Sequence, residues 1–334
     1  MTTSPEAVPA LSVIIPTHNR RASVLATLDS LAGVVPADVA IEVIVVDDGS
    51  DDGSAEAAAS WSGPSPVTVL TQPNRGAAAT RNRGAARARA DYLLFLDDDM
   101  RAAPGLIEAH LDARDAGADV VVGRLTLDPS SPDTLMSRNV DRWSHETTTR
   151  LGAAPRMFDP DDIVAGHLGV RRSVFEKIGG FAESFTQDGR YGNEDLDLGR
   201  RLIASGAAVW FVPEASTAQY YCVTADQHLR QMRDLGTSDL LLMVESTDAH
   251  DGLGVRQAKW MHQPASRVGG LLWRVPRTAD RVVGPHRWFT CRRVDAGRQD
   301  ARTRRWYRIH RGIAYRAGRA HAPADLRRRA GVEA

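Results

Sequence analysis

Three consecutive carboxylates, Asp97, Asp98 and Asp99, follow the apolar run YLLFL at residues 92–96. Ending a buried strand in negative charge is costly, because carboxylates repel one another and lose their hydration. In an extended segment, residues i and i+2 point to the same side, so Asp97 and Asp99 can hold one hard cation. Mg²⁺ or Mn²⁺ held by one or two carboxylates completes its shell with water and phosphate oxygens. The three carboxylates therefore predict half of a metal–diphosphate site, with Mn²⁺ or Mg²⁺ as the cofactor.

Two other apolar runs also end in polar residues. Residues 11–15 lead into Thr17, His18 and Asn19, and residues 41–46 lead into Asp47 and Asp48. A single Asp at a strand end is most often a helix cap or a turn former. Ligands of α/β sheets bind beyond the carboxyl ends of the strands, where all three clusters would meet. We expect one shared site at this edge.

The elements that must position these clusters can be read from the apolar pattern. Apolar runs predict buried strands, and apolar spacing of three and four or an Ala-rich composition predicts helices between them. Continuous apolar strands that alternate with helices indicate a parallel sheet covered on both faces, hence an α/β fold. The predicted strands are 11–15, 41–46, 66–72, 92–96 and 118–123, and the predicted helices include 20–33 and 76–90.

Composition limits the class of protein. The chain has 334 residues with two cysteines, too few for a disulfide framework or a zinc ribbon. The start shows no secretory signal, and no apolar run is long enough to span a membrane, so we expect a cytoplasmic protein. The net charge of zero hides an asymmetry, since residues 256–334 hold 20 Lys and Arg against 5 Asp and Glu. A basic extension therefore follows an acidic body.

Six segments in order resemble family 2 glycosyltransferases with the GT-A fold, over residues 10–220. SVIIPTHNR, IEVIVVDDGSDDGS, QPNRGAAATRNRGAARA and YLLFLDDDM are similar to the nucleotide-binding half, and AGHLGVRRSVFEKIGGF and YGNEDLDLGRRLIASGAAVWFVPEA to the acceptor half. The resemblance implies a mainly parallel nucleotide-binding sheet flanked by helices. The domains would be a GT-A domain at 8–250, with a donor half at 10–123 and an acceptor half at 124–250. A mostly helical basic extension would occupy 251–334.

The resemblance also implies roles for particular residues. Asp99 would be the metal ligand proper and Asp97 a metal or ribose contact, while Asp98 would point the other way. Asp48 would accept the N–H of uracil more readily than Asp47. Gly76 would let the backbone pass close to the nucleotide, and Arg81 would meet the phosphates. The predicted donor-binding set is Pro16, Thr17, Asn19, Asp47, Asp48, Gly76, Arg81, Asp97 and Asp98.

The acceptor half would supply the base. An acceptor hydroxyl needs a base as it attacks the anomeric carbon, and Glu194-Asp195 resembles the family's Glu-Asp pair at a helix start. Asp195 is the predicted base, and Asp197 would face the opposite side of the helix. The alternative is a set of surface ion pairs with the arginines at 200 and 201. His167 and Trp143 are candidate acceptor contacts.

Two features depart from the family pattern. A histidine that can complete the metal site is replaced by the segment around Gln219, Tyr220 and Tyr221, and His228 arrives late. The Q-x-x-R-W motif of processive members is absent, which predicts transfer of one sugar. The expected partners are a nucleotide-sugar donor, which the resemblance implies is a UDP-sugar, and a hydroxyl acceptor. The acceptor is a sugar, a lipid-linked sugar, a peptide or a natural product.

Other functions remain open from the residues alone. A haloacid-dehalogenase phosphatase also uses D-x-D after a strand, but it expects Thr or Val where this chain has Arg101. A sugar-nucleotide nucleotidyltransferase and a non-catalytic carbohydrate- or nucleotide-binding module are the further alternatives. The extension interleaves arginine with aromatic residues, which favours either contact with an anionic membrane surface from the cytoplasmic side or a packed helical flap. It lacks a nucleic-acid-reading module, so no nucleic-acid partner is expected.

Overall fold

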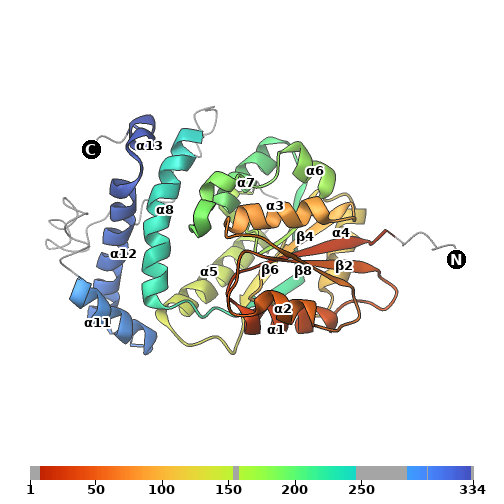
Figure 1. Ribbon diagram of the computed structural model, residues 1–334, viewed down its shortest axis with the longest axis horizontal. Helices are drawn as coiled ribbons and strands as arrows, with labels where there is room; N and C mark the ends of the chain where they lie inside the picture. The colour runs from red at the N-terminus through yellow and green to blue at the C-terminus, as the bar shows by residue number, and fades with distance from the viewer. Residues whose placement is uncertain (1–7, 153–157, 246–283, 299, 332–334) are drawn as a thin grey trace. The chain divides into compact units, whose positions relative to one another are not determined.

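The structure is a computed structural model that describes residues 8–152, 158–245, 284–298 and 300–331. The chain forms two compact units (Figure 1). The first comprises Met1–Ser131, Val140–Gly189 and Glu194–Tyr221, and the second comprises Pro132–Asn139, Arg190–Asn193 and Cys222–Ala334. Among the described helices, none combines the length and the apolar character needed to cross a bilayer.

The first unit is built on one mixed sheet. Its strands are β1 (Leu11–Thr17), β2 (Ile41–Asp47), β3 (Val67–Thr71), β4 (Tyr92–Leu96), β5 (Met100–Ala102), β6 (Val120–Leu127), β7 (His167–Arg171) and β8 (Val209–Gln219). They lie in the order β3-β2-β1-β4-β7-β6-β8-β5. The strands β3, β2, β1 and β4 are parallel neighbours, whereas β7 runs antiparallel to both β4 and β6, and β5 runs antiparallel to β8. The predicted α/β fold is confirmed. The parallel block β3-β2-β1-β4 lies in the donor half, and β6 and β8 form a further parallel pair.

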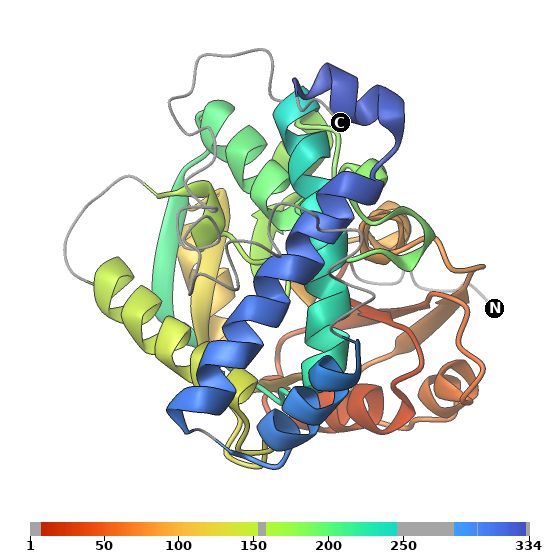
Figure 2. The same cartoon turned by 90° about the vertical axis from the view of Figure 1, so that its left-hand side faces the viewer.

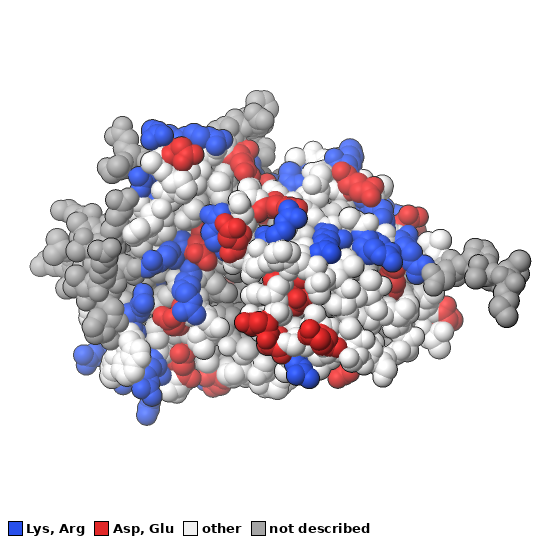
Figure 3. All heavy atoms as spheres, in the orientation of Figure 1, with Lys and Arg blue, Asp and Glu red and all other residues white. Residues whose placement is uncertain are grey.

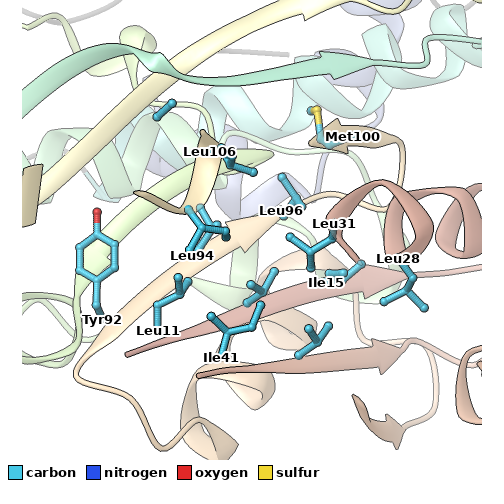
Figure 4. Close-up of a cluster of buried hydrophobic side chains, with 14 of the residues drawn as sticks. Leu11, Ile15, Leu28, Leu31, Ile41, Tyr92, Leu94, Leu96, Met100 and Leu106 are labelled. Atoms are coloured by element: carbon cyan, nitrogen blue, oxygen red, sulfur yellow. The ribbon is translucent and has the colours of Figure 1, made fainter. Parts of the chain in front are cut away.

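Helices cover both faces of this sheet because successive strand residues point to opposite sides. In β1, Val13 and Ile15 belong to one buried cluster and Ile14 to the other. Figure 4 shows the first cluster, where β1, β2 and β4 meet helix α1. The helices of the unit are α1 (Arg21–Ala32), α2 (Ser54–Ala59), α3 (Ala77–Arg87), α4 (Leu106–Asp115), α5 (Leu135–Gly152, whose first turn belongs to the second unit), α6 (Arg172–Lys177) and α7 (Glu194–Ala204).

The second unit is helical. It contains α8 (Ala225–Glu245), α11 (Gly284–Asp295), α12 (Ala301–His321) and α13 (Ala324–Arg329), and α8 and α12 lie side by side along their length (Figure 2). Gly236 of α8 and Gly318 of α12 permit the close approach, because an added Cβ would lie 2.1 Å from the carbonyl oxygen of Tyr315 and 1.8 Å from that of Arg233, respectively. The predicted helical C-terminal extension is confirmed.

The compact units divide at residue 222, whereas the sequence placed the boundary after residue 250, which lies outside the described residues. The difference has a physical cause in α8. This helix buries Leu240 and Val244 against Leu326 of α13, so its apolar face belongs to the helical unit. The apolar spacing of α8 predicts a buried face but not whether that face packs on the sheet or on the C-terminal helices.

Candidate functional site

The carboxyl ends of β1, β2 and β4 meet at one edge of the sheet, as predicted. Thr17 pairs with Asp47 in the β1–β2 register, and the backbone N–H of Asp48 donates to the carbonyl of Thr17 at 2.9 Å. The hydroxyl of Thr17 donates to the Asp98 carboxylate at 2.7 Å. The three polar clusters therefore form one connected site.

Asp47 and Asp48 differ in what their carboxylates bind. Asp48 accepts from the side-chain amide of Gln72 at 2.8 Å and from the backbone N–H groups of Arg75 and Gly76 at 2.9 and 2.8 Å. Asp47 accepts from the backbone N–H of Ser50 through Oδ2 at 3.0 Å. Its Oδ1 is buried and has no hydrogen-bond partner among the described residues. The open acceptor at this end of the site is therefore Asp47, not Asp48.

The loops around this pair are fixed by Asn19 and Gly76. Asn19 adopts a left-handed conformation at φ 52°. Its backbone N–H donates to the Ser50 hydroxyl oxygen at 2.8 Å, and its side-chain oxygen accepts from the N–H of Asp51 at 2.9 Å. Gly76 has φ 90°, and an added Cβ would lie 1.8 Å from the carbonyl oxygen of Thr186. Gly76 is thus required by backbone packing within the protein. Pro16 lies in β1 opposite residue 46 and carries no polar side chain to the site.

The metal-ligand candidates occupy the turn after β4. Asp99 contacts Arg20 Nη1 at 3.1 Å and the Gln219 amide at 3.3 Å, so Gln219 stands where a histidine was sought. Asp98 contacts the same Arg20 nitrogen at 3.0 Å. Burial raises the pKa of Asp98 to about 7, although Arg20 acts to lower it, and burial also raises the pKa of Asp99. Sequence reasoning missed Arg20, whose only signal was its place directly after the polar end of β1.

Arg81 joins the donor half to the acceptor half. Its guanidinium donates to Asp97 at 2.7 Å and to Glu194 at 3.2 Å, and only 5% of its side chain is exposed. It also lies 5.4 Å above the ring centre of Phe181. Coulombic contacts with Asp97, Asp195 and Glu194 hold the pKa of Arg81 above its ordinary value despite burial. Arg81 is therefore a permanent cation between two carboxylates that are 97 residues apart in sequence.

Asp195 stands in the first turn of α7, where the positive end of the helix dipole favours a carboxylate. The Oδ1 atom of Asp195 is buried and has no hydrogen-bond partner among the described residues. Burial, and next the charge of Glu194, raises the pKa of Asp195, and the backbone N–H of Ala165 acts to lower it. An unpartnered acceptor of raised basicity fits a group that takes up a proton.

The neighbours of this carboxylate pair have structural partners. Asp197 binds Arg201, whose guanidinium also donates to the carbonyls of residues 178 and 180. In the second unit, Asn193 donates to Asp239 at 2.8 Å, and the Tyr315 hydroxyl donates to the same carboxylate. The ion-pair interpretation thus holds for Asp197 and not for Asp195.

The two candidate acceptor contacts, His167 and Trp143, line the same pocket. Both ring nitrogens of His167 are engaged inside the first unit, one with His110 and one with the Thr217 hydroxyl, each at 3.0 Å. His167 can therefore contact an acceptor substrate only through the surface of its ring, because neither ring nitrogen is left to form a hydrogen bond. Trp143 is 39% exposed. The pocket is lined by Leu125, Trp143, Asp162, Val164, His167 and Phe211.

His228, considered as a late metal ligand, lies in α8 of the second unit. Its Nδ1 is 2.6 Å from the hydroxyl of Tyr307, and the two rings are stacked. Of the other residues near the expected histidine, Tyr220 donates its backbone N–H to the carbonyl of Asp99 at 2.8 Å, and Tyr221 donates its own to the hydroxyl of Ser131 at 3.0 Å.

The donor set fits a hard divalent cation that shares its shell with a ligand. In the described part of the chain, no group of three or more His, Cys, Asp or Glu side chains is arranged to hold a metal ion. Asp97 and Asp99 supply carboxylate oxygens, and Asp97, with 29% of its side chain exposed, has no described hydrogen bond on Oδ2. Two protein carboxylates with phosphate and water oxygens are the usual shell of Mg²⁺ at nucleotide sites.

The fold is the predicted GT-A fold. A solved mannosyltransferase from Pyrobaculum calidifontis, in complex with GDP-Man and Mn²⁺, superposes with a TM-score of 0.59 at 18% identity, covering 94% of this chain and 87% of that one. At this identity the likeness concerns the fold. Residues 12–179 match the model of glycosyl transferase family 2, and the chain belongs to that family.

Curated relatives agree with this assignment. Residues 155–226 also match the model described as N-terminal domain of galactosyltransferase. Validoxylamine A glucosyltransferase from Streptomyces hygroscopicus subsp. limoneus is 34% identical over 224 residues, 60% of this chain and 49% of the relative. An uncharacterized glycosyltransferase from Haemophilus influenzae is 44% identical over 90 residues, 27% of this chain and 29% of the relative. The chain spans about half the length of the first of these relatives and less of the second.

Proposed function

We propose that the protein transfers a single sugar from a UDP-sugar to an acceptor hydroxyl, with inversion at the anomeric carbon. The acceptor oxygen forms a bond to that carbon, the bond from the carbon to the diphosphate breaks, and the acceptor proton passes to Asp195. The buried, unpartnered Oδ1 of Asp195 carries the proposal, because such an atom needs a donor to satisfy it. The hydroxyl group of an acceptor substrate in this position would donate the missing hydrogen bond to Asp195 and would also be the nucleophile.

Arg81 connects the base to the donor. It pairs with Glu194 beside the base and with Asp97 at the donor end. In the donor complex, Asp97 and Asp99 would hold Mn²⁺ or Mg²⁺, and the cation would stabilise the leaving diphosphate as a Lewis acid. The mannosyltransferase neighbour contains Mn²⁺ with its nucleotide sugar, which supports a divalent cation here.

We assign recognition of the uracil ring to Asp47. The N3–H of uracil is a donor, and Asp47 Oδ1 is a buried acceptor without a described partner. The Asp48 carboxylate already receives three donors from the loop at residues 72–76. The family resemblance implied this role for Asp48. We instead assign uracil recognition to Asp47, and Asp48 shapes the loop.

The test is a donor panel. UDP-glucose, UDP-galactose, UDP-N-acetylglucosamine and GDP-mannose are incubated with the full chain and Mn²⁺, and the released nucleoside diphosphate is measured with and without sugar, lipid-linked, peptide and natural-product acceptors. We expect release from one UDP-sugar, suppressed by excess EDTA. Release that persists in EDTA would contradict the metal assignment, and release from GDP-mannose alone would contradict uridine recognition.

We also propose contact with an anionic membrane surface through α11. Trp288 and Phe289 are 61% and 55% exposed, and Arg292 and Arg293 stack on them at 4.9 and 5.8 Å from the ring centres. On the face drawn in Figure 3, basic and acidic side chains are interspersed. The proposed membrane contact therefore rests on the exposed aromatic side chains of α11 and not on a uniformly basic surface. The Trp288→Ala, Phe289→Ala double variant should lose sedimentation with phosphatidylserine vesicles, and equal sedimentation would exclude α11 as the contact.

A further inference from the structure

The three carboxylates after β4 are held by two arginines in different ways. Arg81 is buried on Asp97 and anchored at its other side by Glu194. Arg20, from the loop between β1 and α1, reaches Asp98 and Asp99 with one nitrogen, and 43% of its side chain is exposed. The Arg20 pairs are partly buried, because the Asp98 and Asp99 side chains are only 6% and 11% exposed. A guanidinium that reaches solvent is nevertheless less firmly held than the buried one of Arg81. Of the two, Arg20 is therefore the cation that can leave.

Asp98 and Asp99 also differ in their other partners. Asp98 accepts from the buried Thr17 hydroxyl at 2.7 Å, and its backbone carbonyl accepts from Thr27 at 2.7 Å. Beyond Arg20, the described side-chain contact of Asp99 is the amide of Gln219, at 3.3 Å or more. Asp98 is thus fixed by good hydrogen bonds, while Asp99 is held chiefly by the guanidinium. Releasing Asp99 from Arg20 would disturb little else.

We propose that Arg20 is an internal counterion that occupies Asp99 when no divalent cation is bound and gives up that carboxylate, while keeping Asp98, when a cation binds. This rests on the proposed role of Asp99 as a metal ligand. A guanidinium and a divalent ion cannot share the same carboxylate oxygen closely, because their positive charges repel. Arg20 therefore lowers the affinity for free metal and leaves the site neutralised between turnovers.

The test is binding of Mn²⁺ alone to the full chain, measured from the free-ion signal in electron paramagnetic resonance at about 0.15 M salt, where exposed charges are screened. Arg20→Gln should bind Mn²⁺ about three- to fivefold more tightly than the wild type, the upper part of the range for losing a competing, partly exposed pair. Arg21→Gln is the matched control, because it removes the same charge from the neighbouring exposed residue. It should bind within about twofold of the wild type, since its charge is screened.

Asp99→Asn separates the proposal from the function on which it rests. If Asp99→Asn loses Mn²⁺ binding while Arg20→Gln binds as the wild type does, or more weakly, the counterion role is wrong and the metal site stands. If Asp99→Asn binds normally, the metal assignment itself fails, and the counterion role with it. Equal tightening by Arg21→Gln, or undetectable binding by both wild type and Arg20→Gln, would also overturn the role of Arg20.

Discussion

Replacing Arg81 by methionine should destabilise the protein strongly. The substitution keeps an unbranched apolar side chain but removes the one cation that contacts both Asp97 and Glu194, at 2.7 and 3.2 Å. These carboxylates, with the nearby Asp195, would then stay buried together without compensation. Breaking a buried ion pair by removing one partner costs about 3–5 kcal/mol. In a unit of this size each kcal/mol lowers the melting temperature by about 2–4 °C, so we expect a fall of about 10 °C.

The loss should depend on pH. Burial raises the pKa of Glu194 and Asp195 even in the presence of Arg81, which acts to lower both. Without Arg81 both values rise further, so the folded protein binds protons more tightly than the unfolded chain. The extra penalty of the variant is absent below the folded pKa values of the wild type, where both folded proteins hold these protons. It grows as the pH rises through those values, and the folded pKa of Asp195 is about 8. The variant should lose more stability at pH 8 than at pH 5.

The assay is thermal unfolding followed by circular dichroism at both pH values, in EDTA. Arg83→Met is the control, because Arg83 lies on the same helix, is exposed and makes its short contact with a backbone carbonyl. It should change stability by less than about 1 kcal/mol. A loss in Arg81→Met that matches Arg83→Met, or that is equal at pH 5 and pH 8, would refute the account of Arg81.

Three further predictions concern stability. Burial lowers the pKa of His167 to about 4 and that of His110 well below its ordinary value, so stability should be full above about pH 6.5 and fall as the pH drops toward 4; a urea midpoint unchanged between pH 7 and 5 would contradict this. Tyr315→Phe removes a donor from the buried Asp239 and should cost about 1–3 kcal/mol in thermal unfolding, and an unchanged melting temperature would contradict the contact. Gly76→Ala should cost about 4 kcal/mol or prevent folding, and a soluble variant of normal melting temperature would contradict the close approach at that residue.

The sequence was sufficient for the donor half of the fold. Strands such as residues 11–15 and 92–96 are buried on both faces, so their apolar character is continuous and easily recognised. Parallel neighbours then bring their carboxyl ends together, which is why the polar residues after β1, β2 and β4 could be expected at one edge. The contact of Thr17 with Asp98, which was expected to point the other way, was not predicted. The parallel arrangement of the strands is enough to predict where the polar clusters meet, without knowledge of side-chain geometry.

The partners within the site could not be predicted in the same way. Arg81 and Glu194 are 113 residues apart, and their contact depends on how α7 packs against α3 and the sheet. The distinction between Asp47 and Asp48 depends on a loop that folds back onto one carboxylate only. No sequence pattern around Arg20 predicts that its side chain contacts Asp98 and Asp99. Such contacts follow from tertiary packing, which a local pattern does not encode.

The most direct test of the central claim is sugar transfer by Asp195→Asn, measured with the donor and acceptor found in the panel, alongside calorimetric affinity for UDP. The substitution keeps the shape of the side chain and removes its basicity, so transfer should fall by about two to four orders of magnitude. UDP affinity should stay within about threefold, since UDP is proposed to bind in the donor half. Transfer at the wild-type rate by Asp195→Asn would contradict the assignment of Asp195 as the base.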